Sequence, residues 1–128
     1  MNREKIGKLY KKYELTEEDV FKHKHYLIIT RSGIEKVSAK ESITVTYEVI
    51  RCEKDFCVVK AIATKGEVQL ETFGSAIKGA TYADGSTNSF YVMEMAEKRS
   101  FSRAVLKMTG FYELGVFGED ESEDFKKG

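Results

Sequence analysis

The chain has 128 residues, of which 41% are hydrophobic, and its 21 basic and 21 acidic side chains leave no net charge at pH 7. This length predicts one domain with a single core. No apolar run approaches the roughly 18 residues that a membrane helix needs, and the first residues lack the apolar region of a secretory signal. We therefore expect a cytoplasmic protein that makes no membrane contact.

The charges are unevenly distributed along the chain. Residues 119–128 contain five acidic residues and two lysines, and subtracting these from the totals leaves 19 basic and 16 acidic residues in 1–118. We expect a domain over 1–118 and a flexible acidic tail over 119–128. A mildly basic body with an acidic tail fits several nucleic-acid-binding proteins. The segment Glu119–Phe125 could dock onto a protein partner, cover a basic groove, or serve only to keep the protein in solution.

The N-terminal region predicts two short helices. Residues 3–13 carry apolar side chains at helical spacing. Thr16 precedes three acidic residues, a pattern typical of a helix N-cap, and the helix that it begins is expected to end near Lys24.

A strand and a third short helix are expected next. Residues 26–30 form a compact apolar run rich in β-branched side chains, which predicts a strand. Ser32 and Glu35 have the spacing of a capping box, which predicts a helix over about 33–41 with Ile34 and Val37 buried.

Three consecutive strands are predicted over residues 43–51, 56–64 and 67–77. Their short connections favour a curved antiparallel meander, with the 26–30 strand as a candidate edge strand. The apolar spacing of the third strand changes beside Gly74, which predicts a β-bulge there.

Residues 89–110 form the longest stretch with helical periodicity, and Gly110 is a C-terminal stop signal. One side of this helix carries apolar residues, namely Met93, Phe101, Ala104, Val105 and Met108. Arg99, Arg103 and Lys107 follow one another at intervals of four residues on the other side. This basic row fits either a solvated face or one wall of a groove that tracks a sugar-phosphate backbone. The sequence as a whole predicts an α+β fold in which the meander packs against this helix.

Nucleic-acid binding is the function that these cations favour. Cations contact phosphates and aromatic rings stack on bases, a combination that suits single strands. The candidate DNA-binding residues lie on the helix, on the strands and in the loop before the helix: Arg99, Arg103, Lys107, Lys98, Arg51, Lys60, Lys78 and Tyr82.

Signals for a metal site or cofactor are weak. Cys52 and Cys57 are too few for a disulfide scaffold, and they are expected to face each other across a hairpin as two thiols. A zinc site needs four ligands, and His23 and His25 are the only histidines in the chain. We therefore expect no metal and no cofactor.

The chain lacks the common enzymatic motifs, including the P-loop, the dinucleotide-binding glycine pattern and the serine nucleophile elbow. A small metal-dependent nuclease built on Glu48, Glu67 or Glu71 is conceivable, although strand surfaces routinely carry such acids. We expect a protein that is not an enzyme.

Residues 95–125, and most specifically the segments AEKR and SRAVLK within them, are similar to part of small proteins of phage recombination modules. Over about 43–125 the chain resembles the phage single-strand annealing recombinases of the Rad/Sak type. The resemblance implies a β-β-β-α core that assembles into rings or filaments. It also implies a positively charged groove for single-stranded DNA between the sheet and the long helix.

By position, the resemblance makes Arg99, Arg103 and Lys107 the cations on the helix side of this groove, with Arg51 and Lys60 as their counterparts on the sheet. The expected function is non-enzymatic binding and annealing of single-stranded DNA in phage recombination, in the cytoplasm of a bacterial host. Exposed sheet edges also favour a homo-oligomer. The alternative is a protein-interaction module, an adaptor or an inhibitor of a host protein, without DNA affinity.

Overall fold

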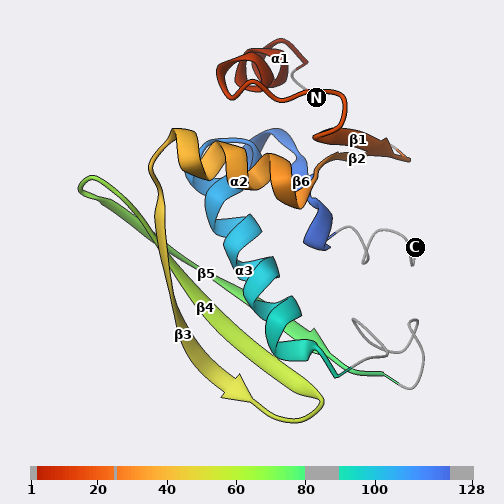
Figure 1. The fold of residues 1–128 in the computed structure, drawn as a ribbon, viewed down its shortest axis with the longest axis vertical. Coiled ribbons are helices and arrows are strands. Elements are labelled where there is room, and N and C mark those ends of the chain that lie inside the picture. The colour runs from red at the N-terminus through yellow and green to blue at the C-terminus, as the bar shows by residue number, and fades with distance from the viewer. Residues whose placement is uncertain (1–2, 25, 80–89, 122–128) are drawn as a thin grey trace.

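The computed structural model describes residues 3–24, 26–79 and 90–121, and this part of the chain has an α+β fold (Figure 1). The helices are α1 (Arg3–Lys12), α2 (Arg31–Lys40) and α3 (Val92–Met108), with short 3-10 turns η2 (Tyr112–Leu114) and η3 (Glu119–Glu121). The strands are β1 (Val20–His23), β2 (Tyr26–Ile29), β3 (Thr44–Cys52), β4 (Phe56–Lys65), β5 (Val68–Ile77) and β6 (Val116–Gly118). The predicted fold class, a meander packed against one long helix, is confirmed.

The larger sheet is the predicted antiparallel meander, in the order β3-β4-β5. Its strands begin and end within one residue of their predicted bounds. Along β4 the side chains of Cys57, Val59, Ala61 and Ala63 are buried, and the residues between them are more exposed. Because side chains alternate across a strand, the buried set faces α3, which lies across the sheet (Figure 1). The other face points away from the helix.

The contact between α3 and β5 is very close at Gly74. A Cβ atom at this position would lie 2.4 Å from the carbonyl oxygen of Ala96 and 2.5 Å from the backbone nitrogen of Ser100. Thr72 and Ala76, on the same face of β5, are also small and buried. These small residues let the backbone of α3 approach the sheet directly.

Gly74 does not mark the predicted bulge, and that prediction is wrong. The pairing of β4 with β5 runs without a shift, whereas the register shift of this sheet lies in β3, between Val49 and Arg51. The change in apolar spacing along β5 has a different cause. Phe73 and Ile77 lie on the face away from α3, where each is about half exposed.

The smaller sheet has the order β1-β2-β6, with β2 antiparallel to β1 and parallel to β6. The strand predicted over 26–30 is therefore confirmed, but its predicted place beside the meander is wrong. Ile28 and Ile29 are fully buried. The central position gives β2 a hydrogen-bonded neighbour at each edge, and Ile29 is covered by packing in one apolar cluster with Ile34 and Val37 of α2.

A turn and a strand replace the helix that was predicted to follow Thr16. The Asp19 carboxylate accepts hydrogen bonds from the backbone nitrogen of Thr16 at 2.9 Å and from Lys36 Nζ at 2.7 Å. The backbone nitrogen of Thr30 donates to the Asp19 carbonyl at 2.8 Å, which ties the turn to the end of β2. Thr16 Oγ1 does accept from the backbone nitrogen of Glu18 at 3.3 Å. The chain then enters β1 instead of continuing as a helix.

Helix α2 begins two residues before its predicted start because Thr30, and not Ser32, is its N-cap. Thr30 Oγ1 accepts a hydrogen bond from the backbone nitrogen of Gly33 at 3.1 Å. Ile34 and Val37 are fully buried, as predicted.

Two apolar clusters meet along α3. The first joins α1, α2, the smaller sheet and the C-terminal part of α3 through Ile6, Tyr13, Ile29, Ile34, Val37, Val105, Leu106, Phe111 and Val116. The second joins the N-terminal part of α3 to the meander through Cys57, Val59, Ala76, Val92 and Ala96. Within the described ranges, none of the helices has both the length and the apolar character that crossing a membrane requires.

Gly74→Ala is expected to lower the free energy of unfolding by about 2–3 kcal/mol, because the added methyl group meets helix backbone that cannot move independently. Urea unfolding followed by circular dichroism measures this change. Gly7→Ala in α1 is the matched control, because no atom lies within 4 Å of its added Cβ. The control should be neutral or stabilise the protein by about 0.5–1 kcal/mol. Equal stability of the two variants would contradict the close contact.

The turn at Asp19 predicts a pH-dependent contribution to stability. Hydrogen bonds from Lys36 and from Thr16 lower the pKa of the Asp19 carboxyl. Such a carboxyl stabilises the fold above its unfolded pKa of about 3.9, and the contribution is lost as the pH falls through the folded pKa. Asp19→Asn should therefore be less stable than the parent at pH 7, and the difference should shrink in strong acid. Urea titrations at several pH values measure it. Glu17→Gln, at an exposed neighbour, should stay within about 0.5 kcal/mol of the parent throughout.

Candidate nucleic-acid interface

Two of the three cations in the predicted basic row bind the edge of the meander. Arg99 Nη1 donates to the carbonyl oxygen of Ser75 at 3.3 Å, and Arg103 Nη1 donates to that of Phe73 at 3.0 Å. Four residues of helix rise about 6 Å, and two residues of an antiparallel strand span about 6.8 Å. The two repeats match, so one side of α3 reaches alternate carbonyls of the edge strand β5.

These contacts change the meaning of the basic row. Only 7% of Arg99 is exposed, and Arg103 also forms a 2.9 Å ion pair with Glu121. Arg99 and Arg103 are therefore neither a solvated face nor an open wall of a groove, and they bind the β5 edge. Lys107 does remain exposed, and its Nζ lies 5.8 Å from the centre of the Tyr112 ring.

The first residues of the predicted acidic tail are packed against the same helix. Besides the Arg103–Glu121 pair, Ser102 Oγ donates to Asp120 Oδ2 at 2.6 Å. Arg31 Nη1 lies 3.5 Å from the same Asp120 oxygen, and only 7% of Glu121 is exposed. The folded body thus includes η3. The rest of the predicted tail, residues 122–128, lies outside the described residues.

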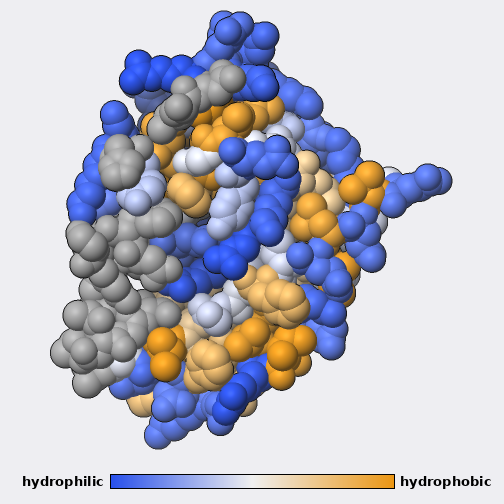
Figure 2. Space-filling view, turned by 180° about the vertical axis from the view of Figure 1, so that it is seen from behind, coloured by the Kyte–Doolittle hydropathy of each residue, from blue (hydrophilic) through white to orange (hydrophobic). Residues whose placement is uncertain are grey.

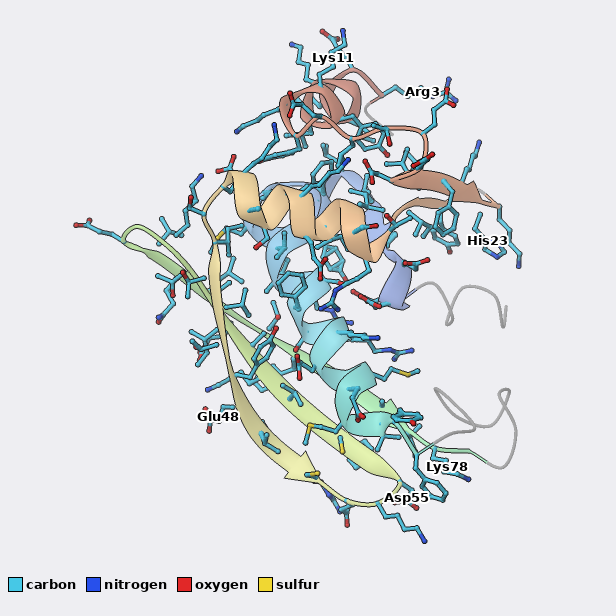
Figure 3. All side chains as sticks on the ribbon, in the orientation of Figure 1. Arg3, Lys11, His23, Glu48, Asp55 and Lys78 are labelled. Carbon is cyan, nitrogen blue, oxygen red and sulfur yellow. The ribbon has the colours of Figure 1, made fainter. Side chains whose placement is uncertain are left out.

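Lys60 lies on the face of the meander that points away from α3. It alternates with Val59 and Ala61, which are buried under the helix. Its Nζ is 3.0 Å from Glu71 and 3.1 Å from Glu48, and hydrogen bonds to these two carboxylates raise the pKa of Lys60. Figure 3 shows Glu48 projecting away from α3. Lys60 is thus held across the sheet by two carboxylates, which more than offset its charge.

Arg51 pairs in register with Val58 on the same outer face. Its Nε donates to Glu53 at 2.6 Å, and its guanidinium group lies 5.3 Å from the centre of the Phe56 ring. The sheet cations and the helix row therefore do not share one surface. At Gly74, packed backbone occupies the space expected for DNA between sheet and helix.

A different set of cations and aromatic rings meets at the start of α3. We call it the basic–aromatic patch, and it consists of Lys54, Lys78, Phe90, Tyr91 and Lys98. Lys78 Nζ lies 4.7 Å and Lys54 Nζ 5.1 Å from the centre of the Phe90 ring. Phe90 is 57% exposed and Tyr91 is 69% exposed. Rings in this setting can stack on planar groups while the lysines contact anions.

The ends of the meander strands position the lysines of the patch. Lys54 lies in the tight turn between β3 and β4, where the backbone nitrogen of Glu53 donates to the carbonyl oxygen of Phe56 at 2.8 Å. Lys78 follows β5, and its backbone nitrogen donates to the carbonyl oxygen of Asp55 at 2.7 Å. Figure 3 shows Asp55 and Lys78 together at this end of the sheet, beside the start of α3.

A surface hollow of about 620 Å³ adjoins the patch, lined by Tyr91, Glu94, Met95, Lys98, Glu119 and Asp120. Its volume is in the range of small-molecule sites. Its three carboxylates make it a poor place for a phosphate, so anions are expected on the lysine side of the patch.

The patch contains two of the predicted residues, Lys78 and Lys98. Sequence reasoning missed Lys54, Phe90 and Tyr91. The signal was present as two adjacent aromatic residues directly before a long helix, but these were assigned to the helix itself. Tyr82, also predicted, lies outside the described residues, so its place relative to the patch is not defined.

The carboxylates considered for a nuclease do not form a metal centre in this part of the chain. Glu48 and Glu71 both bind Lys60, and Glu67 is exposed. Among residues 3–24, 26–79 and 90–121, no group of three or more His, Cys, Asp or Glu side chains is placed to hold a metal ion. His23 lies in β1, and His25 lies outside the described residues.

Comparisons of the chain with protein-family models, with curated protein sequences and with solved structures each found no significant match.

The hydrogen bonds from α3 to the edge of β5 predict that Arg99 contributes to stability and that the exposed Lys107 does not. Arg99→Met is expected to lower the free energy of unfolding by about 1–3 kcal/mol, because the part-buried hydrogen bond from a charged donor to the Ser75 carbonyl oxygen is lost. Lys107→Met, on the same helix, is expected to stay within about 0.5 kcal/mol of the parent. Thermal and urea unfolding of both variants tests this difference. Parent-like stability of Arg99→Met would show that the hydrogen bond to Ser75 contributes nothing.

Proposed function

We propose that the protein binds single-stranded DNA without an enzymatic step and promotes strand annealing in phage recombination, in the cytoplasm of a bacterial host. The observation that supports this proposal is the basic–aromatic patch, where the exposed Phe90 ring carries two lysine ammonium groups and adjoins Tyr91. Proteins hold single strands by stacking bases on such rings and by placing cations along the phosphates. The resemblance to annealing recombinases supports the same function.

In the proposed mechanism a base stacks on Phe90, and Lys54 and Lys78 move from the ring to the flanking phosphates. Tyr91 stacks on a second base, and Lys98 lies beside it in the hollow whose carboxylates disfavour a phosphate. Stacking uses the faces of the bases. Their hydrogen-bonding edges therefore stay available for a complementary strand, which is what annealing requires.

This site differs from the groove between sheet and helix that the resemblance implies. At Gly74 the helix lies directly on the sheet, and Arg99 and Arg103 are engaged with β5. Replacing both arginines by glutamate would therefore test folding before it tested binding. Substitutions in the exposed patch separate the two.

We also propose that the protein acts as a homo-oligomer, a ring or a filament, assembled through β3. The hydrogen bonds from Arg99 and Arg103 close the β5 edge, whereas β3, among the residues that the structure describes, pairs with β4 alone. Tyr47, Val49 and Ile50 on β3 are 40%, 54% and 49% exposed. An edge strand with exposed apolar side chains is a template for pairing with another chain.

A protein-interaction module without DNA affinity is the second candidate. Phe73 and Ile77, on the outer face of the meander, are 50% and 48% exposed. Figure 2 shows hydrophobic side chains gathered along this part of the molecule. Contiguous apolar surface of this kind is typical of protein contacts. Light scattering with and without an oligonucleotide separates the candidates, because assemblies that grow on single-stranded DNA favour the first.

Combined Phe90→Ala and Tyr91→Ala substitutions are expected to weaken binding of a fluorescent oligothymidylate at least about 30-fold, because two lost stacking contacts at about 1–3 kcal/mol each remove at least about 2 kcal/mol. Fluorescence anisotropy measures the affinity, and circular dichroism confirms folding. Phe21→Ala is the control, because this ring is 37% exposed on β1, outside the patch. Equal affinity of the parent and the double variant would refute the site.

The lysines of the patch predict a change in salt dependence. Each phosphate neutralised on a single strand contributes about −0.7 to the slope of log affinity against log salt. Lys54→Gln combined with Lys78→Gln should therefore make the slope shallower by about 1.4. Lys22→Gln, at an exposed position of β1, should leave it unchanged. An unaltered slope in the double variant would remove these lysines from the interface.

A further inference from the structure

The two cysteines of the chain face each other across the turn between β3 and β4. Cys52 and Cys57 are paired in register, and their Sγ atoms are 3.7 Å apart. Cys52 is exposed, whereas Cys57 is fully buried in the apolar cluster under α3. The pair therefore combines an accessible thiol with a protected one.

The backbone places the two thiols in a geometry that a disulfide can adopt. The hydrogen bond from the Glu53 nitrogen to the Phe56 oxygen marks these residues as a hydrogen-bonded pair. The next pair along the ladder, Cys52 with Cys57, is then a non-hydrogen-bonded pair, in which Cα atoms are about 4.5 Å apart and side chains lie closest. Disulfides span Cα separations of about 4.4–6.8 Å. The sulfur atoms need only approach to about 2.05 Å, which side-chain rotation can supply.

We propose that Cys52 and Cys57 form a reversible disulfide by exchange with a small-molecule disulfide such as oxidised glutathione. Cys52 loses its proton and its thiolate attacks one glutathione sulfur, which breaks the glutathione disulfide and releases one thiolate. Cys57 then loses its proton and attacks Cys52 Sγ, which forms the protein disulfide and releases the second glutathione. Two electrons pass to the glutathione disulfide, and the two protons end on the two glutathione thiols.

The different environments of the cysteines set this order of events. Burial raises the pKa of the Cys57 thiol, and its Sγ lies 3.6 Å from the carbonyl oxygen of Glu53. A glutathione molecule cannot reach a side chain with no exposed surface, so the mixed disulfide forms at Cys52. Cys57 is already in contact with that sulfur and displaces the glutathione.

The disulfide would close the turn that carries Lys54 and whose Asp55 carbonyl accepts the backbone nitrogen of Lys78. Oxidation would therefore fix one side of the basic–aromatic patch. The exchange chemistry itself does not depend on the proposed DNA binding, and mass spectrometry reports it without any nucleic acid.

The experiment equilibrates the full chain with graded ratios of reduced to oxidised glutathione, quenches with acid and measures the intact mass. The parent is expected to accumulate a species that has lost two hydrogen atoms and carries no glutathione, and excess reduced glutathione should reverse this. Cys57→Ser should instead retain a stable glutathione adduct, and Cys52→Ser should remain unmodified. Cys57→Ala replaces Cys57→Ser if circular dichroism shows that the serine variant is unfolded.

A second readout tests closure of the turn. Hydrogen exchange at the backbone amides of residues 53–56 should slow at least severalfold in the oxidised parent and stay unchanged in Cys52→Ser under the same conditions. A parent that keeps the glutathione adduct as stably as Cys57→Ser, or that stays reduced at every ratio, would overturn the proposal.

Discussion

The backbone contact between α3 and β5 is the interaction on which the rest of the structure depends. Gly74 leaves no side chain between strand and helix, and Thr72 Oγ1 donates to the carbonyl oxygen of Ser100 at 2.8 Å. Because helix and strand lie so close together, Arg99 and Arg103 can donate hydrogen bonds to the carbonyl oxygens of Ser75 and Phe73 at the free edge of β5. This contact covers the inner face of the meander and closes its β5 edge. It also places the C-terminal part of α3 in the apolar cluster formed with α1, α2 and the smaller sheet.

The same contact determines which charges are left for binding. Three of the predicted DNA-binding cations are engaged within the fold: Arg99 and Arg103 bind β5, and Lys60 is held between two carboxylates. A chain with no net charge and an internally used basic row cannot bind DNA as a broad cationic surface. The proposed DNA binding therefore falls to the basic–aromatic patch, where the Phe90 and Tyr91 rings would add stacking to the charges of the lysines.

The sequence predicts the meander well because alternation with a period of two is a local signal, and the apolar run of β2 is equally clear. Sequence-based prediction fails where a residue's role depends on which other segment packs against it. A helical wheel places Arg99 and Arg103 on one side of α3 but cannot show that strand carbonyls meet them there. In the same way, Gly74 could mark a bulge or a helix contact, and only the packing distinguishes them. The basic–aromatic patch was missed because Lys54 is far from Phe90 in the sequence. Only the folded structure brings the turn between β3 and β4 next to the start of α3.

The proposed assembly and the proposed DNA binding would be linked by the energetics of stacking. Two stacked bases contribute about 2–6 kcal/mol, and about 4 kcal/mol corresponds to only millimolar affinity. Stacking at a single patch would therefore hold a strand only weakly, and several patches along one DNA molecule would hold it far more tightly. The open β3 edge leads directly into the turn that carries Lys54. Copies that assemble through β3 would thus repeat the patch at regular intervals, and the strand itself would favour the assembled state because it binds several copies at once.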